Sequence, residues 1–392
     1  MKTLPHINTR FASVATAVIS LSMVVALPAC QRGWDSTDDE TTPTPTPPPT
    51  EALAHYNGPG SSWRMELDEQ ADTFTLNKSA IPGSDPTLEI EGAYEELSNG
   101  FLRLTVSAAT NGQGINANDT ISGIQVGKAL TLLLPFGDEK NQILALPNAN
   151  NCPSQNTAAN WLLYKQANSF DSDNHNSNHY GIYTYSVLSS VTELTTQYNL
   201  ATPTDDVDGV ALDSGACAEG LLATDTIQYY FTNGVTAALA LAENNEQLTT
   251  GNSDQSQFLL TLEQRSIAAL SDLAGTYNGI MFDSQLSDTS RNFPVKADCS
   301  SGTCTFKQIT DIETGDLADA EYSLSFQEED INSPSIGFVI GNLTDANSNG
   351  GVTTCSVNID YAGSGDKFIA CIGISPGSSN TDELFNLFLV SE

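Results

Sequence analysis

Basic residues are scarce in this chain: it has 14 lysines and arginines against 48 aspartates and glutamates, and a formal net charge of −34 at pH 7. Such an acidic surface repels nucleic acids and anionic lipid headgroups, which argues against nucleic-acid binding. Charged residues make up only 16% of the chain. Asn, Gln, Ser, Thr and Gly supply much of the remaining polarity, as is typical of strand-rich secreted domains.

Motifs for resident metals are also lacking. No CxxC pairs of the zinc-binding kind occur, and Asn176 stands where a His-Glu-x-x-His motif on His175 and His179 would need glutamate. Ser356 stands where an EF-hand loop starting at Asp345 would need its bidentate glutamate. We therefore expect no metal and no cofactor. Oxygen ligation of calcium by the loop at 171–179 is the alternative.

A serine-hydrolase motif fails on chemical grounds. Gly373-Ile-Ser375-Pro-Gly377 matches the GxSxG pattern, whose oxyanion hole uses the backbone N–H after the serine. Pro376 has no N–H, and no histidine follows His179 to act as the general base. The segment is predicted to be a turn, and we assign no catalytic residue.

The first 30 residues have the layout of an export signal. Lys2 and Arg10 precede an apolar run at 11–27, and a small residue, Ala29, precedes Cys30. Leu27-Pro28-Ala29-Cys30 resembles the lipobox of bacterial lipoproteins, in which the cysteine is acylated and becomes the first residue. The resemblance implies cleavage after residue 29 and anchoring to a bilayer through Cys30. Gln31 at the next position implies the outer membrane by the enterobacterial sorting rule.

The next segment, residues 31–62, is rich in Asp, Glu, Thr and Pro. It has too few apolar residues to bury a core and favours extended polyproline II structure. We interpret residues 30–62 as a lipidated cysteine followed by a disordered stalk.

The remaining chain has the pattern of an all-β protein. Short runs of alternating or continuous apolar residues are separated by turn residues, and Asn233-Gly234 lies between two of them as in a tight hairpin. The expected strands are 72–78, 88–94, 101–107, 121–134, 226–232, 235–242, 258–262, 277–282, 322–326, 336–340, 352–361, 368–374 and 384–390. The best helical stretch is 264–273.

These strands predict two mainly antiparallel β-meander or barrel-like domains after the stalk. A polar stretch at 249–257 marks the boundary, which gives an N-terminal domain at 63–250 and a C-terminal domain at 258–392. The five residues from Leu273 to Tyr277, around Gly275, resemble the opening strand of lipocalin-like meander barrels.

The seven cysteines leave six to pair once Cys30 is lipidated. Cys299 and Cys304 bracket a four-residue hairpin tip, and Cys355 and Cys371 lie symmetrically about a turn at 362–365. Opposed antiparallel residues come within disulfide range, so both pairs are expected to be bridged. By elimination, Cys152 pairs with Cys217.

One segment has the composition of a binding site. Aromatic side chains between Cys152 and Cys217 alternate with amides, carboxylates and histidines, which together can stack on and hydrogen-bond a ligand. Packing in a strand core and a solvated loop is the alternative. The candidate ligand-binding residues are Trp161, Tyr164, Asp171, Asp173, His175 and His179.

The sequence favours a non-catalytic lipoprotein of the bacterial outer membrane, anchored through its acylated cysteine and facing the periplasm or the cell surface. It would bind a small or apolar ligand, or an envelope partner, in a β domain. A structural or adhesive surface module is one alternative, and a secreted hydrolase acting on a polymer is the other.

Overall fold

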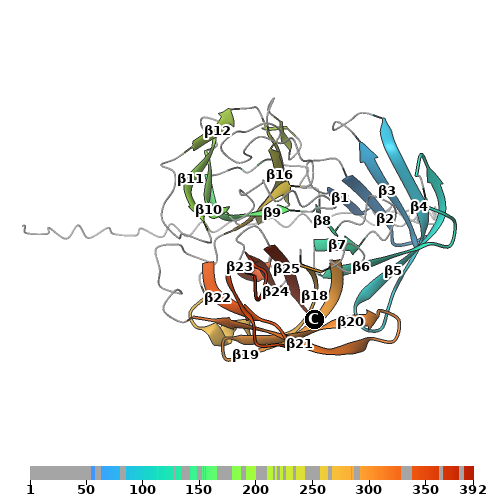
Figure 1. Ribbon diagram of the computed structural model, residues 1–392. Coiled ribbons are helices and arrows are strands. Elements are labelled where there is room, and N and C mark those ends of the chain that lie inside the picture. Colours follow the sequence, from blue (N-terminus) through green and yellow to red (C-terminus); the bar gives the residue numbers. More distant parts are fainter. Residues whose placement is uncertain are drawn as a thin grey trace, which may run out of the picture. The chain divides into compact units, whose positions relative to one another are not determined.

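The structure is a computed structural model, and its described strands belong to the unit at residues 51–392. In this unit it describes residues 54–57, 63–79, 85–112, 114–126, 129–133, 142–147, 152, 154, 156–165, 179–186, 191–199, 210–214, 217–218, 221–223, 227–232, 235–242, 257–263, 267–283, 285–286, 292–327, 338–361, 365–378 and 384–392. The described elements are strands and one short 3-10 helix, and the strand pairs are antiparallel (Figure 1). The all-β, barrel-like architecture expected from the sequence is confirmed.

The first eight strands form a closed barrel in which each strand pairs with the next in the chain and β1 pairs with β8. Closure rests on two residue pairs, Tyr56 with Pro147 and Asn57 with Leu146. The strands are β1 (Ala54–Asn57), β2 (Trp63–Asp68), β3 (Thr73–Ser79), β4 (Pro86–Glu96), β5 (Phe101–Thr110), β6 (Thr120–Val126), β7 (Ala129–Leu133) and β8 (Gln142–Pro147). We call this the first barrel.

Nine strands form an open middle sheet in the order β12-β11-β10-β9-β17-β16-β15-β14-β13. Its first and last strands in the chain, β9 and β17, lie side by side at the centre, and the hairpins between them extend to both edges. The strands are β9 (Thr157–Lys165), β10 (His179–Ser186), β11 (Val191–Asn199), β12 (Val210–Ser214), β13 (Cys217–Ala218), β14 (Leu221–Ala223), β15 (Ile227–Thr232), β16 (Val235–Ala242) and β17 (Gln257–Glu263). The expected hairpin of 226–232 and 235–242 is confirmed as β15 and β16.

The last eight strands form a second closed barrel of the same up-and-down kind, closed by β18 and β25. The strands are β18 (Gly275–Asp283), β19 (Asn292–Ser300), β20 (Thr303–Asp311), β21 (Asp316–Phe326), β22 (Phe338–Thr344), β23 (Gly350–Tyr361), β24 (Asp366–Ile374) and β25 (Leu384–Ser391). The segment around Gly275 is thus the first strand of a meander barrel. We call this the second barrel.

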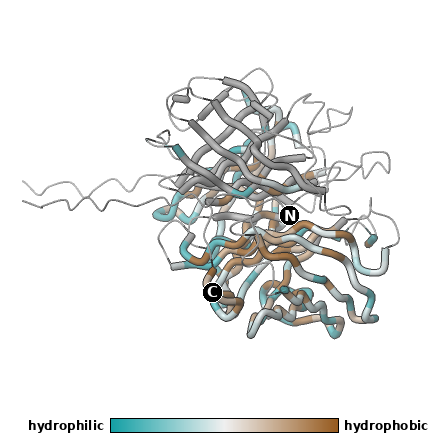
Figure 2. The backbone as a smooth tube through the Cα atoms, turned by 90° about the vertical axis from the view of Figure 1, so that its left-hand side faces the viewer, coloured by the Kyte–Doolittle hydropathy of each residue, from teal (hydrophilic) through white to brown (hydrophobic). Residues whose placement is uncertain are grey.

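Large side chains fill the described interiors of both barrels. Alternate residues of each strand point inward, as the period of two in a β-strand requires. In the first barrel they include Trp63, Met65 and Leu67. In the second, they include Tyr277, Met281, Phe293, Phe306 and Phe326. Strands β24 and β25 are buried on both faces, and the tube near the C-terminus in Figure 2 is hydrophobic over long stretches.

Three local expectations are corrected. The expected stalk contains β1, because the backbone of Ala54–Asn57 pairs with β2 although the composition there gives no strand signal. The expected single strand 121–134 is divided into β6 and β7, which pair as a hairpin. In the expected helix at 264–273, the described residues form only a 3-10 turn at Leu270–Leu273 (η3), whose start is held by Asp272 accepting from the backbone of Ala268 and Ala269.

The strand pairing places one strand of the middle sheet after the polar stretch at 249–257 that marks the expected boundary. β17 follows that segment but pairs with β9 and β16, so it belongs to the middle sheet. The three sheets separate between Pro147 and Thr157 and between Glu263 and Gly275. A pairing between strands so far apart in the chain leaves no signal in the residues between them.

The two disulfides expected in the C-terminal half are present and lie inside the second barrel. Cys299 and Cys304 are directly opposed in β19 and β20, with Cα atoms 3.9 Å apart. Cys355 and Cys371 are opposed in β23 and β24, 4.0 Å apart. The first hairpin is tighter than expected, because only Ser301 and Gly302, both with positive φ, form its turn.

Candidate functional site

The six candidate binding residues are only partly placed. Trp161 and Tyr164 lie on β9, where their backbones are paired with Gly181 of β10 and with Phe258 of β17 respectively. His179 begins β10. The side chains of these three residues, and the whole of Asp171, Asp173 and His175, lie outside the described part of the chain, so this binding site stays a prediction.

The predicted Cys152–Cys217 disulfide and the predicted lipidation of Cys30 also involve atoms outside the described part of the chain. Cys152 is disulfide-bonded, but the side chain of its expected partner, Cys217, is outside the description. Cys30 also lies outside the described residues.

The loop resembling half an EF-hand uses its carboxylate to hold its own backbone. Asp345 Oδ1 accepts hydrogen bonds from the backbone N–H groups of Asn347 (2.9 Å) and Asn349 (2.8 Å), and Oδ2 accepts from Asn349 Nδ2 (2.9 Å). Burial opposes ionisation, but these hydrogen bonds outweigh it and lower the pKa of Asp345. Among the described residues, no three His, Cys, Asp or Glu side chains are arranged to hold a metal ion.

Ser375, the serine of the GxSxG motif, lies in the predicted turn after β24. It is fully buried, and its Oγ donates a hydrogen bond to Asp283 Oδ1 at 2.8 Å. A serine without solvent exposure cannot meet a polymer substrate, so its role is structural.

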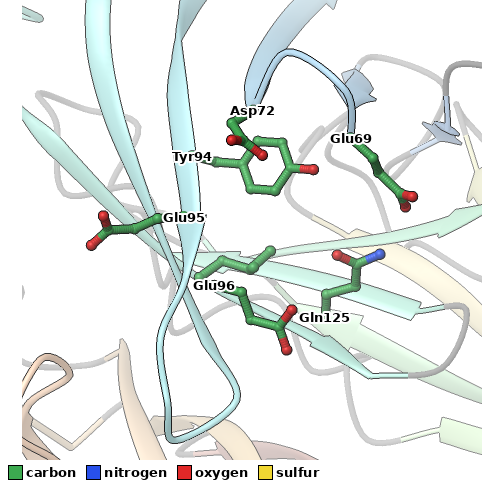
Figure 3. Close-up of a pocket in the computed structure, with 7 residues that line it drawn as sticks. Glu69, Asp72, Tyr94, Glu95, Glu96 and Gln125 are labelled. Atoms are coloured by element: carbon green, nitrogen blue, oxygen red, sulfur yellow. The ribbon is translucent and has the colours of Figure 1, made fainter.

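A cavity of about 580 Å³ lies at the mouth of the first barrel. The turn between β2 and β3 contributes Glu69 and Asp72, and the ends of β4, β5 and β6 contribute the rest of the wall. The lining residues are Glu69, Asp72, Tyr94, Glu95, Glu96, Leu102 and Gln125. Figure 3 shows Glu69, Asp72, Glu96 and Gln125 around Tyr94, whereas Glu95 points away on the other side of its strand.

Local hydrogen bonds fix the β2–β3 turn beside the cavity. Asp68 Oδ1 accepts from the backbone N–H groups of Gln70 and Ala71, both at 3.0 Å. The backbone N–H of Tyr94 donates to the carbonyl oxygen of Asp72 at 2.9 Å, which joins the turn to β4. Below these polar groups, Leu102 belongs to the barrel core and is 2% exposed. The cavity therefore has an acidic rim above an apolar base.

The electrostatic potential at this mouth is negative. Burial raises the pKa of the Tyr94 phenol, and the nearby charges of Glu69, Asp72, Asp68 and Glu96 raise it further. The described lining residues include no lysine or arginine. Within the described residues, Glu69, Asp72 and Glu96 form no ion pair.

Four described lysines of the barrels have contacts outside the cavity lining. Lys296 pairs with Glu392 at 2.8 Å, Lys307 pairs with Glu321 at 3.8 Å, and Lys367 Nζ donates to the carbonyl oxygen of Ala274 at 2.6 Å. Lys78 lies over the ring of Trp63, 5.3 Å from its centroid. These contacts leave Glu69, Asp72 and Glu96 without a described lysine or arginine as partner.

Sequence reasoning missed this cavity, although a signal was present. Leu88, Ile90, Gly92, Tyr94 and Glu96 alternate along β4, so Glu96 continues the inward-facing row beyond the core. With 48 carboxylates in the chain, one more glutamate in such a position does not stand out.

In comparisons with known proteins, no protein-family model and no curated protein sequence matches this chain. A similar solved structure is that of the isotype 1 transferrin binding protein B from serogroup B Neisseria meningitidis, at 12% sequence identity and a TM-score of 0.16. The match covers 84% of this chain and 65% of the neighbour, which is less than two thirds of its length. At that TM-score the likeness carries no argument about function.

Proposed function

We propose that this chain is a non-catalytic, lipid-anchored binding protein of the bacterial outer membrane that takes an organic cation at the mouth of its first barrel. The anchor rests on the lipobox-like residues up to Cys30. The observation that carries the binding role is the acidic rim of the cavity formed by Glu69, Asp72 and Glu96, with no lysine or arginine among the described lining residues.

The filled barrel interiors favour this site over an apolar ligand inside a barrel. In the described strands of both barrels, the inward positions are occupied by packed side chains such as Leu104 and Phe306. The volume of about 580 Å³ is within the range of small-ligand sites. The open mouth therefore accommodates a ligand that the described core does not.

The chemistry of the lining selects for positive charge joined to a short apolar part. Ammonium or guanidinium groups can pair with the carboxylates and also lie against the aromatic ring of Tyr94. The ring of Tyr94 and the side chain of Leu102 are the parts of the lining that methylene groups can contact. Polyamines and lysine or arginine side chains of a protein partner have this chemistry. Because the carboxylates are at the surface, binding should weaken as salt is added.

Isothermal titration of the mature chain with spermidine, carrying Cys30→Ser to keep it soluble, tests the proposal. We expect saturable binding that becomes about 3- to 150-fold weaker when Glu69→Gln, Asp72→Asn and Glu96→Gln are combined, because three exposed ion pairs together contribute about 0.6–3 kcal/mol. The matched control combines Asp85→Asn, Glu89→Gln and Glu91→Gln. These remove the same charge from the first barrel but do not line the cavity.

Two outcomes would overturn the proposal. One is the absence of saturable spermidine binding. The other is an equal loss in both triple variants, which would mean that the cation responds only to net charge.

A further inference from the structure

The β4–β5 hairpin forms part of the cavity wall on one face and contacts the second barrel on the other. Tyr94, Glu96 and Leu102 line the cavity. Glu95 and Arg103 are opposed in the strand pairing and lie on the other face, since side chains alternate along a strand. The two faces bring the acidic rim close to the contact between the barrels.

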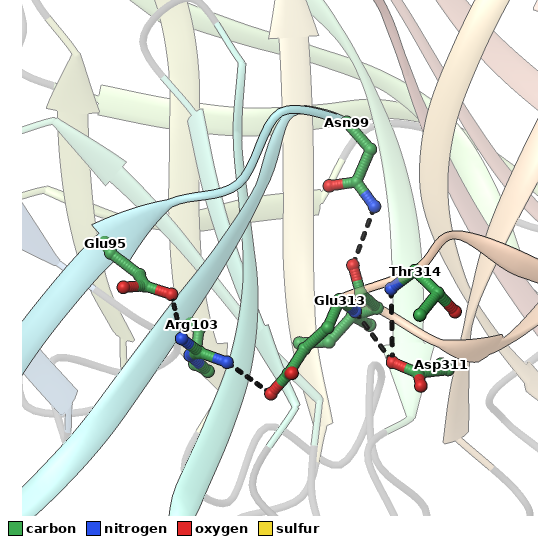
Figure 4. Close-up of polar contacts among 7 residues, drawn as sticks. Glu95, Asn99, Arg103, Asp311, Glu313 and Thr314 are labelled. Carbon is green, nitrogen blue, oxygen red and sulfur yellow. Dashed lines mark hydrogen bonds and ion pairs between the residues drawn. The ribbon is translucent and has the colours of Figure 1, made fainter.

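Polar contacts at the hairpin tip join the two barrels (Figure 4). Asn99 Nδ2 donates to the carbonyl oxygen of Ile312 at 2.7 Å, and Asn278 Nδ2 donates to the carbonyl oxygen of Asn99 at 3.0 Å. Ile312 belongs to the β20–β21 turn, whose shape is held by Asp311 Oδ1 accepting from the backbone N–H of Glu313 at 2.8 Å. The turn therefore presents its groups to the first barrel in a fixed conformation.

An apolar cluster lies beneath these polar contacts. It is formed by Phe101 and Ile124 of the first barrel and by Ile280 and Ile309 of the second, each 1–3% exposed. In β5 the side chains of Leu102, Leu104 and Val106 point into the barrel interior. Phe101 is therefore on the outer face of the strand, where the neighbouring barrel buries it. Because all four side chains are removed from water between the barrels, the contact has apolar support.

Arg103 is shared between the barrels. Its guanidinium pairs with Glu95 on its own hairpin and with Glu313 of the second barrel (Figure 4). The pKa of Arg103 is raised above its ordinary value, chiefly by the hydrogen bond to Glu313. Glu313 is thus the partner that holds this cation toward the second barrel, while Glu95 holds it at the edge of the acidic cavity.

We propose that Glu313 of the second barrel is a positioning residue for the cavity of the first: it keeps the Arg103 guanidinium away from the acidic mouth, where it would compete with a cationic ligand. This rests on the proposed function. When Glu313 is lost, Arg103 keeps its charge, because a guanidinium does not deprotonate in proteins. Glu95, which lines the cavity, is then its remaining partner on its own barrel. Without the pull of Glu313 the guanidinium lies closer to the acidic rim, so the protein supplies its own competing cation.

Spermidine titrations of four variants in the soluble mature chain test this role. Glu313→Gln should weaken binding about fivefold, the equivalent of about 1 kcal/mol for one exposed charge pair. Glu321→Gln is the matched control, because it removes the same charge from the second barrel and breaks the pair with Lys307 away from the contact. It should change affinity less than about twofold.

The decisive variants concern Arg103. Arg103→Gln alone should bind at least as tightly as wild type, and Arg103→Gln combined with Glu313→Gln should return to within about twofold of wild type, because the competing cation is gone. A role of Glu313 in barrel geometry alone would predict no such rescue.

Equal affinities for the Glu313→Gln and Glu321→Gln variants, or a double variant as weak as Glu313→Gln, would overturn the inference and leave the proposed function intact. Wild-type protein that binds spermidine with no dependence on Glu69, Asp72 and Glu96 would overturn the proposed function and this inference together.

Discussion

Replacing Tyr277 with phenylalanine should destabilise the second barrel through one hydroxyl group. Tyr277 is 0% exposed at the start of β18, and its Oη donates a hydrogen bond to the carbonyl oxygen of Leu273 at 2.6 Å. Leu273 is itself 1% exposed and ends the short 3-10 turn before the strand. The bond therefore ties the entry of the chain to the barrel interior.

Tyr277→Phe leaves the carbonyl oxygen of Leu273 without its hydrogen-bond donor, and this loss lowers the free energy of unfolding. A buried carbonyl without a partner costs about 1–3 kcal/mol, and the phenylalanine ring otherwise fills the same space. We expect Tyr277→Phe to lower the free energy of unfolding by about 1–3 kcal/mol at neutral pH, measured by urea unfolding without reductant.

The same hydroxyl should give a specific pH dependence. Burial raises the pKa of Tyr277 from its ordinary value of 10.0 to about 12. Between pH 10.0 and about 12, the Tyr277 phenol is mostly ionised in the unfolded chain but still protonated in the folded chain. Its contribution is therefore fully present below that ordinary pKa and is lost as the pH rises toward the folded value.

Comparing wild type with Tyr277→Phe between neutral and alkaline pH isolates the contribution of the Tyr277 hydroxyl, since the other tyrosines and the lysines titrate in both proteins. The difference in unfolding free energy between wild type and Tyr277→Phe should be constant at neutral pH and should shrink between pH 10.0 and about 12. A difference below about 0.5 kcal/mol at neutral pH, the lower limit for one hydrogen bond, would refute the argument. So would a difference that does not change with pH in the alkaline range.

Three further predictions concern the disulfides, the charge and the anchor. Replacing Cys355 and Cys371 by alanine should lower the free energy of unfolding in urea by about 3 kcal/mol, and replacing Cys299 and Cys304 should lower it by about 2 kcal/mol. The first loss is larger because the entropy of loop closure grows with the sequence separation, which is 16 for the first pair and 5 for the second. The reverse order would contradict this account. The melting temperature should rise between about 10 mM and about 1 M NaCl, as the screening length falls from about 30 to about 3 Å and weakens self-repulsion; a flat profile in scanning fluorimetry would count against it. Cys30→Ser should move the protein from the membrane to the soluble fraction with its melting temperature unchanged, and continued sedimentation with membranes would exclude the lipid anchor.

The sequence predicts best the features that depend on neighbours in the chain. Asn99-Gly100 forms the β4–β5 turn because glycine adopts a positive φ, here +81°, without strain. The two disulfides of the second barrel join strands that follow each other, so the turn between them determines which cysteines face each other. Local chemistry is sufficient in both cases.

Features that depend on distant strands could not be predicted. The pairing of β9 with β17 and the closure of each barrel use backbone hydrogen bonds, which any residue can accept and any residue except proline can donate. For the same reason, the four-residue strand β1 gave no signal inside a segment whose composition indicates a stalk.

The contacts around the candidate site could not be predicted either, because their residues are far apart in the sequence. Glu95 and Arg103 face each other on one hairpin, and a reader of the sequence could pair them from the turn between them. Their connection to Glu313 requires the docking of two barrels whose strands lie some two hundred residues apart, as the separation of 213 between Asn99 and Ile312 shows. Arg103 is one of only 14 basic residues, so its position is informative once the fold is known.

The short closing strand of the first barrel has a mechanical consequence. β1 is held to β2 over four residue pairs but to β8 over only two, and it is the strand into which the N-terminal part of the chain leads. Tension applied to the chain before Ala54 therefore acts directly on the strand that completes the barrel. The β1–β8 seam is the weakest link under such a load, and its opening would turn a closed barrel into a sheet with a free β8 edge while β2 to β8 stay paired. A chain pulled from a point before Ala54 would yield first at this seam.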